Sequence, residues 1–212
     1  MSRWDISTTR HSYDVPAEIA IPGEPIEYLR AWIDAAHAAG AHEANAMCLS
    51  TAGDDCRPSA RMVLLRGLDE RGLIFFTSYF SRKGRELTRN PNAAVVFFWP
   101  EIHRQVGVEG RVEQLPEPES DAYFASRPRG HQLSAWASEQ SEEVESRQIL
   151  EQRLEDFTQR FESGPVPRPH SWGGFLLRPD RFEFWQGRSN RLHDRVELCR
   201  SGSTWMQRRL QP

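Results

Sequence analysis

RFEFWQGRSNRLHDR, residues 181–195, is the stretch that most constrains the fold of this chain. Its first five residues alternate charged and aromatic side chains, a period of two that predicts a half-buried strand whose aromatic face packs inward. Gln186 and Gly187 end the alternation, and cationic or ionisable side chains follow: Arg188, Arg191, His193 and Arg195. A solvated basic loop is one interpretation of this cluster. The flat ring of Trp185 beside the guanidinium groups favours another, a site for a planar, phosphorylated ligand.

The length and composition of the whole chain limit the classes of protein to which it can belong. A length of 212 residues allows one domain, or two small ones, and we expect one. The formal charge of -3, from 27 basic and 30 acidic residues, gives no overall field that favours nucleic acid or an anionic membrane. Hydrophobic residues make up 38% of the chain, and its apolar runs are far shorter than the roughly 20 residues that cross a bilayer. We expect a soluble protein with no nucleic-acid or membrane partner.

The N-terminus and the cysteines indicate the compartment. Residues 1–13 lack the apolar core of a secretory signal and already contain Asp5. The three cysteines form no CxxC pair and no Cys/His ligand spacing, which predicts reduced thiols and no metal site: Cys48, Cys56 and Cys199. We therefore expect a cytoplasmic protein.

Residues 1–24 differ in pattern from the segment that follows. They are polar, contain Pro16 and Pro22 and show no hydrophobic period, which predicts an arm that is mobile unless a ligand or partner orders it. Pro25 then opens an amphipathic helix that Gly40 ends. Residues 25–212 are expected to form a single domain.

From residue 46 to residue 113 the pattern changes to short strands separated by turn signals. A short helix interrupts them at residues 81–89, where Ser81 is expected to cap an N-terminus that carries Arg82 and Lys83. A helix start with two cations can hold a phosphate. Five strands at this spacing suggest a barrel or a sandwich, and their expected ranges are 46–51, 58–66, 73–78, 93–99 and 104–113.

The second half of the chain is expected to add helices and further strands. Helices are predicted at residues 117–126 and 142–161, with a turn at residues 127–130 after the first. A proline-rich connector precedes four more strands, at residues 172–177, 181–185, 195–199 and 205–210. The C-terminal strands are expected to complete the same barrel, because each would otherwise expose an aromatic face. The predicted fold is mainly β, with flanking α-helices.

Cationic and hydrogen-bonding side chains gather in four stretches: residues 61–66, 81–83, 123–131 and 188–195. They could serve two anionic groups separately. In the first stretch, RMVLLR, Arg61 and Arg66 are expected on opposite faces of one strand, so that this strand could border two neighbouring sites.

These stretches lie within motifs whose order is typical of a known family. The motifs are ARMVLLRG, FFTSYFSRKGREL, RQVGVEGRVE, YFASRPRG, QLSAWASEQS, WGGF, EFWQGRSNRLHDR and the terminal RRLQP, found between about Pro25 and Pro212. In them the chain resembles the pyridoxine/pyridoxamine 5'-phosphate oxidases, FMN enzymes that make pyridoxal 5'-phosphate. The resemblance implies a split β-barrel that works as a homodimer, with FMN bound in the cleft between the subunits.

The resemblance also implies a set of flavin contacts. Arg82 and Lys83 would meet the FMN phosphate, and amide or guanidinium donors would face the flavin edge, where negative charge grows on reduction. The remaining predicted cofactor residues are Arg61, Met62, Val63, Leu64, Phe76, Thr77, Gln105, Gln140, Ser141, Trp185 and Arg195.

For the substrate, the family pattern implies a phosphate site formed by Arg66, Tyr123, Arg127 and His131. The family usually has Lys at the first of these positions and Ser at the last, so the pocket keeps its donors but changes its shape. Two further residues, Arg191 and His193, would lie over the pyridine ring as the catalytic pair. Arg10 and Tyr13 of the N-terminal arm loosely resemble a family pair that closes over the substrate.

The implied reaction is hydride transfer from the substrate carbon bearing the amine or alcohol to FMN, with O2 as the acceptor and hydrogen peroxide as product. Arg191 would hold the substrate, and His193 would either hydrogen-bond or shuttle a proton at the reacting atom. Two other functions remain open: a related FMN oxidase acting on another planar substrate, as in phenazine biosynthesis, and a non-catalytic protein that binds flavin or B6 phosphate.

Three further side chains have structural interpretations. Trp136 and Trp172 are expected to be core or interface aromatics, because small residues surround them in the sequence. Asp194 is expected to orient a neighbouring Arg. Its pairing with His193 is the alternative, disfavoured because adjacent residues on an extended segment point apart.

Overall fold

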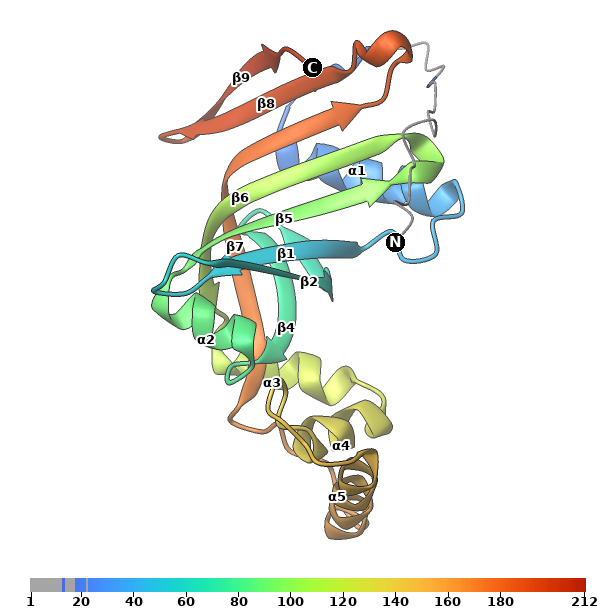
Figure 1. The fold of residues 1–212 in the computed structure, drawn as a ribbon, viewed down its shortest axis with the longest axis vertical. Helices are drawn as coiled ribbons and strands as arrows, with labels where there is room; N and C mark the ends of the chain where they lie inside the picture. The colour runs from blue at the N-terminus through green and yellow to red at the C-terminus, as the bar shows by residue number, and fades with distance from the viewer. Residues whose placement is uncertain (1–12, 14–17, 22) are drawn as a thin grey trace, which may run out of the picture. The chain divides into compact units, whose positions relative to one another are not determined.

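The computed structural model describes residues 13, 18–21 and 23–212 (Figure 1). The chain consists of two compact units. Unit 1 comprises the described residues up to Ala44, together with Val96–Val108 and Arg181–Pro212. Unit 2 comprises Asn45–Val95 and Glu109–Asp180. The single domain over residues 25–212 stays a prediction.

The fold is mainly β with flanking helices, as predicted. The described residues form nine strands: β1 (Ala46–Ala52), β2 (Pro58–Leu64), β3 (Gly67–Asp69), β4 (Gly72–Ser78), β5 (Asn92–Trp99), β6 (Arg104–Gln114), β7 (Trp172–Gln186), β8 (Asp194–Ser201) and β9 (Thr204–Leu210). Their order in the sheet is β2-β1-β5-β6-β7-β4-β3, and β8 pairs with both β7 and β9. The helices are α1 (Pro25–Ala38), α2 (Arg82–Arg89), α3 (Glu117–Ser126), α4 (Arg129–Ala137) and α5 (Arg147–Arg160).

The alternating stretch that opened the sequence forms the second half of β7 in unit 1. Phe182 and Phe184 are fully buried, and the residues between and beside them are only partly so, which confirms the predicted inward-facing aromatic face. Phe184 packs edge-on against Trp32 of α1, and Phe182 packs in the same way against Trp205 of β9. This core therefore uses the period-two pattern of β7 and the apolar stripe of α1.

β7 is a single strand, and the prediction of two strands with a break between residues 177 and 181 is wrong. Proline has no backbone N–H to donate, and Pro179 lies inside this strand. However, the ladder with β4 covers Trp172–Leu177 and the ladder with β8 covers Arg181–Gln186, so residue 179 belongs to neither. The missing donor therefore removes no hydrogen bond from these two ladders.

The helical part of unit 2 also departs from the prediction. The turn expected at residues 127–130 leads directly into helix α4 (Figure 1). Pro128 is at the N-cap position of this helix. Proline fits there because it precedes the hydrogen-bonded turns. Helix α5 begins at Arg147, five residues later than expected, and its described side chains are at most half-buried.

Aromatic side chains join these helices to the sheet of unit 2. Phe124, Leu133, Val166 and Trp172 form a buried cluster, which confirms Trp172 as a core residue. Trp136 is half-buried against Phe157 and Phe161, and its Nε1–H donates to the backbone oxygen of Pro167 at 2.8 Å.

No helix among the described residues has the length and apolar character needed to span a membrane. The three cysteines are free thiols, and in the β1–β2 ladder Cys48 lies opposite Met62.

Candidate functional site

A pocket of about 1210 Å³ lies in unit 2, between the edge strand β2, strand β4, the start of α2 and the segment from α3 to residue 141. Every predicted site residue of unit 2 lines it. The predicted cofactor residues in its wall are Arg61, Met62, Val63, Leu64, Phe76, Thr77, Arg82, Lys83, Gln140 and Ser141. The predicted substrate residues in its wall are Arg66, Tyr123, Arg127 and His131.

The remaining predicted residues lie in unit 1 and do not line this pocket. They are Gln105 on β6, Trp185 on β7, Arg191 and His193 in the loop before β8, and Arg195 on β8. Their part in a common site with the pocket residues stays a prediction.

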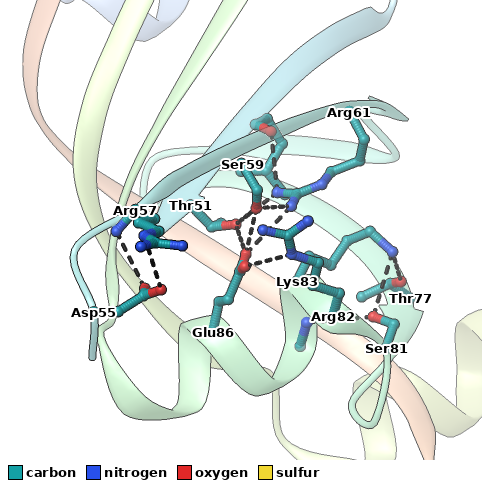
Figure 2. Close-up of polar contacts among 12 residues, drawn as sticks. Thr51, Asp55, Arg57, Ser59, Arg61, Thr77, Ser81, Arg82, Lys83 and Glu86 are labelled. Carbon is teal, nitrogen blue, oxygen red and sulfur yellow. Dashed lines mark hydrogen bonds and ion pairs between the residues drawn. The ribbon is translucent and has the colours of Figure 1, made fainter. Parts of the chain in front are cut away.

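The start of α2 forms the cationic part of the pocket (Figure 2). Ser81 caps the helix as predicted, because its Oγ accepts the backbone N–H of Gly84 at 3.3 Å. The side chain of Lys83 is buried, with the whole residue only 7% exposed, and its Nζ donates to Thr77 Oγ1 at 3.0 Å and Ser81 Oγ at 3.3 Å. Burial, with a smaller effect from Arg61, lowers the pKa of Lys83 to about 8. An ammonium group held in this way is suited to bind an anion.

Glu86, which the sequence interpretation missed, organises the other two cations of this region (Figure 2). Its Oε1 accepts from Arg82 Nε at 2.9 Å, and its Oε2 lies 3.3 Å from Arg61 Nη2. The same Oε2 accepts from Thr51 Oγ1 at 2.5 Å and from Ser59 Oγ at 2.6 Å. Burial alone would raise the pKa of this carboxyl, but hydrogen bonds from Ser59, Thr51 and Arg82 lower it to about 2. Glu86 is therefore an anion that fixes Arg61 and Arg82 beside the pocket.

The helix start is packed closely against the turn before it. A Cβ on Gly84 would lie 2.3 Å from the backbone oxygen of Tyr79 and 2.6 Å from that of Ser78. Only glycine fits at this distance, so the residue at position 84 sets how near α2 comes to the end of β4.

Aromatic rings and one arginine form the other part of the pocket. The ring of Phe76 stacks on Tyr123 at 3.7 Å between centroids and on Trp172 at 5.5 Å. The guanidinium of Arg127 lies over the Trp172 ring at 4.5 Å. Burial lowers the pKa of Arg127, and its Nη1 is buried with no hydrogen-bond partner among the described residues. A buried N–H donor without an acceptor is costly, so this atom is suited to a ligand oxygen.

Arg66 and His131 are both exposed side chains of the pocket wall. The prediction that Arg61 and Arg66 share one strand is wrong, because β2 ends at Leu64. Arg66 instead lies in the segment between β2 and β3. Its backbone N–H donates to the backbone oxygen of Ile74 on β4 at 2.8 Å. His131 lies in the first turn of α4, a helix that the sequence interpretation did not include.

The segment after α4 also reaches the pocket. Gln140 Oε1 accepts from Thr77 Oγ1 at 2.8 Å and from the backbone N–H of Ser78 at 3.3 Å. Ser141 next to it has a left-handed backbone, with φ at 78°. Thr77 therefore accepts a hydrogen bond from Lys83 and donates one to Gln140, linking the cationic helix start to the residue 140 segment.

The cationic loop of unit 1 is held by carboxylates. Asp194 is buried and accepts from Arg188 Nε at 2.8 Å and Nη2 at 2.6 Å, as expected for a residue that orients a neighbouring arginine. Arg195 donates from Nε to Glu183 Oε1 at 2.9 Å across the β7–β8 ladder. Arg191 is exposed and, like Asn190 before it, has a left-handed backbone, with φ at 62° and 55°. This conformation is uncommon for residues other than glycine, and it is found frequently in functional loops.

Tyr13 packs against this loop. Its ring centroid lies 4.6 Å from that of His103, and 6.0 Å from those of Trp185 and His193. This position is compatible with the expected cover over the substrate, which stays a prediction. Arg10, the other member of that pair, lies outside the described residues.

The sequence interpretation missed two residues for different reasons, one beside the pocket and one in its lining. Glu86 stands four residues after Arg82 on a helix, a spacing that predicts an ion pair and could have identified it. Trp172 was expected to be a core or interface aromatic, and the sequence has no signal that places one of its faces under Arg127. The pocket also includes several serines without a distinctive spacing: Ser59, Ser78, Ser126, Ser134 and Ser138.

Comparison with known proteins gives the same family over almost the whole chain. A family model described as pyridoxamine 5'-phosphate oxidase matches residues 33–161. A second, described as pyridoxine 5'-phosphate oxidase C-terminal dimerisation region, matches residues 172–212. A pyridoxine/pyridoxamine 5'-phosphate oxidase from Rubrobacter xylanophilus is 53% identical over 213 aligned residues, covering 100% of this chain and 98% of the relative.

Solved structures agree on the fold. PhzG from Burkholderia lata, crystallised with tetrahydrophenazine-1-carboxylic acid, is 36% identical with a TM-score of 0.86, covering 90% of this chain and 94% of that one. A pyridoxamine 5'-phosphate oxidase-related, FMN-binding protein from Nostoc punctiforme is 16% identical with a TM-score of 0.71, covering 91% of this chain and 100% of that one. The agreement confirms the predicted split β-barrel.

Proposed function

Because this chain belongs to the pyridoxamine 5'-phosphate oxidase family, we propose that it is an FMN-dependent oxidase that converts pyridoxamine 5'-phosphate or pyridoxine 5'-phosphate to pyridoxal 5'-phosphate. O2 is the electron acceptor and is reduced to hydrogen peroxide; with the amine substrate, water is also taken up and ammonia released. The observation that carries the proposal is the pocket of unit 2, whose lining contains two separate groups of cationic and hydrogen-bonding side chains. One group is at the start of α2 and the other surrounds Arg127.

The donor set of the pocket fits FMN. Lys83 and Arg82 would bind the FMN phosphate at the N-terminus of α2, where the helix dipole also favours negative charge. Glu86 leaves Nη1 and Nη2 of Arg82 for the ligand, since it accepts from Nε. When bound, FMN would supply the redox chemistry, a two-electron exchange between the substrate and O2.

The second group fits a smaller phosphorylated molecule. Arg127 would donate its unpartnered Nη1 to the substrate phosphate, and the stack of Phe76, Tyr123 and Trp172 keeps its guanidinium in place. Arg66 and His131 add donors from the rim. In unit 1, Arg191 would hold the substrate ring and His193 would contact the reacting atom. These residues align the reactants and exclude water around the transfer.

We also infer a homodimer with FMN at the interface between subunits. The match of residues 172–212 to a dimerisation region supports it. Large exposed apolar side chains support it as well, since such surfaces are unfavourable in water: Met62, Phe98 and Met206 are each more than half exposed.

The decisive test is turnover by the purified, FMN-loaded protein under air. Pyridoxamine 5'-phosphate and pyridoxine 5'-phosphate should each give hydrogen peroxide and the aldehyde chromophore, whereas the unphosphorylated vitamers should react poorly because they leave Arg127 without its acceptor. Absence of turnover with both phosphates, despite bound FMN, would show that the protein is a binding protein or acts on another substrate.

The main alternative is oxidation of a phenazine precursor. The likeness to PhzG supports it, but at 36% identity it is weaker than the 53% to the Rubrobacter oxidase. Tetrahydrophenazine-1-carboxylic acid, assayed beside the two B6 phosphates, separates the possibilities. A substrate without a phosphate would not need the cations around Arg127.

The affinity for FMN should fall at alkaline pH. Lys83 has a pKa of about 8, so its positive charge is present below that pH and is lost above it. If this ammonium binds the phosphate, the Kd for FMN should rise about tenfold between pH 7 and pH 9. Fluorescence titration of the apoprotein with FMN at the two pH values measures this Kd.

Two controls isolate the contribution of Lys83. Riboflavin lacks the phosphate, so its affinity should change little over the same pH range. Lys83→Arg keeps its charge at pH 9 and should remove most of the pH dependence for FMN. An equal pH dependence for riboflavin and FMN would contradict the assignment.

A further inference from the structure

His193 has a defined hydrogen-bond state in this structure. Its Nδ1 lies 3.0 Å from the backbone nitrogen of Arg188 and accepts the N–H of that residue. A backbone N–H can only donate, so Nδ1 must present its lone pair. In the neutral imidazole the hydrogen is then on Nε2.

The side chain of Arg188 is bound by the carboxylate of Asp194, which limits the movement of its backbone. The carboxylate of Asp194, a residue only 8% exposed, accepts from both Nε and Nη2 of Arg188 through one oxygen. The other oxygen of Asp194 accepts from Arg209 Nη1 at 2.9 Å. Asp194 thus faces two guanidinium groups, one of which belongs to the residue whose backbone N–H bonds to His193.

The surroundings of His193 disfavour its charged form. Burial and the nearby cation of Arg191 lower the pKa of His193. Arg188 adds a second cation, which the Asp194 carboxylate neutralises. The rings of Trp185 and Tyr13 pack against His193, with His103 beyond Tyr13. Protonation would also break the hydrogen bond from Arg188, because a protonated Nδ1 cannot accept it.

We propose that Asp194 is a positioning residue that acts through Arg188 to keep His193 as the neutral tautomer with its hydrogen on Nε2, so that His193 donates a hydrogen bond to the substrate and takes no proton from it. An Nε2 that carries a hydrogen has no lone pair for a proton, which decides between the two roles considered for His193. The role toward substrate rests on the proposed function, whereas the tautomer belongs to the protein alone.

Nitrogen-15 NMR of the FMN-loaded protein with labelled histidine tests the tautomer directly. The chain has seven histidines, and the His193 signals are identified by their loss in His193→Gln. We expect a pyridine-type Nδ1 and a pyrrole-type Nε2 at neutral pH, with protonation only below the ordinary histidine pKa of about 6.5. A hydrogen on Nδ1, or an imidazolium at neutral pH, would overturn the proposal. Absence of turnover would contradict the proposed function and leave this result standing.

Variants test whether Asp194 is responsible. Asp194→Asn and Arg188→Lys should each give a mixture of His193 tautomers, or protonation at higher pH, and lower kcat about tenfold with bound FMN retained. Arg188→Lys keeps the backbone N–H and the charge, so it serves if the buried Asp194 variant does not fold. Arg209→Lys is the matched control, since Arg209 pairs with the same carboxylate and should leave the His193 signals unchanged. An equal effect of Arg209→Lys, or none of Arg188→Lys, would refute the route through Arg188.

Discussion

Arg127→Met should lower kcat/KM for pyridoxine 5'-phosphate about 100-fold while leaving the Kd for FMN unchanged. Arg127 has a buried Nη1 without a partner among the described residues, and its guanidinium lies over Trp172. A hydrogen bond to a charged group contributes about 1.5–3 kcal/mol, so the loss of the Nη1 bond to the phosphate accounts for an effect of this size. Methionine keeps an unbranched stem against the aromatic rings, which limits the change in packing. Steady-state peroxide production and flavin titration measure the two quantities.

Arg129→Ala is the matched control for this substitution. Arg129 is two residues further along, and its guanidinium bonds to the backbone oxygens of Phe161 and Gly164 and does not line the pocket. Its removal should cost some stability and little activity. If the two variants lose activity equally, or if Arg127→Met loses FMN, the phosphate of the substrate is bound elsewhere.

Gly84→Ala should destabilise the protein by about 3 kcal/mol and weaken FMN binding at the same time. The new Cβ would overlap the backbone oxygens of Tyr79 and Ser78, and backbone cannot move aside as a flexible side chain does. Helix α2 would have to shift away from β4, taking Lys83 out of reach of Thr77. Thermal unfolding of the apoprotein and the Kd for FMN report the two effects.

Gly130→Ala is the matched control, because Gly130 lies in the first turn of a different helix, α4. A Cβ on Gly130 would have no atom within 4 Å, and alanine is the better helix former, so this variant should be about 0.5 kcal/mol more stable than the parent. Unchanged stability and flavin affinity in Gly84→Ala would mean that α2 does not approach β4 as closely as described.

Short sequence patterns were sufficient to predict the structural features that depend only on residues close together in the sequence. The alternation at residues 181–185 predicted which face of β7 is buried, and Ser81 predicted its cap on α2. Helix α3 has the predicted bounds. In each case the side chains that decide the structure are close in sequence, so one short window contains the whole cause.

The rest depends on contacts between distant residues. Pro179 stops a strand only where its N–H is needed, and the register of two partner strands decides that. In the sequence, Pro128 and Gly130 predict a turn. In the structure α5 packs against the segment that follows them, and this packing favours helix α4 (Figure 1). Likewise, the position of Trp172 beneath Arg127 follows from β7 and the α3–α4 connection meeting in one core. The identity of the predicted site came from motif resemblance, since no single cluster distinguishes a flavin phosphate from a substrate phosphate.

The continuity of β7 limits how this chain can vary in length during evolution. Its first half is paired with β4 and its second half with β8, so a residue inserted or deleted between Leu177 and Arg181 would leave the first ladder in place and move every later residue by one. Side chains alternate along a strand, so Phe182 and Phe184 would exchange faces with their neighbours and the core of unit 1 would be lost. Homologous chains should therefore tolerate insertions at the exposed turn around residue 54 and keep β7 free of gaps.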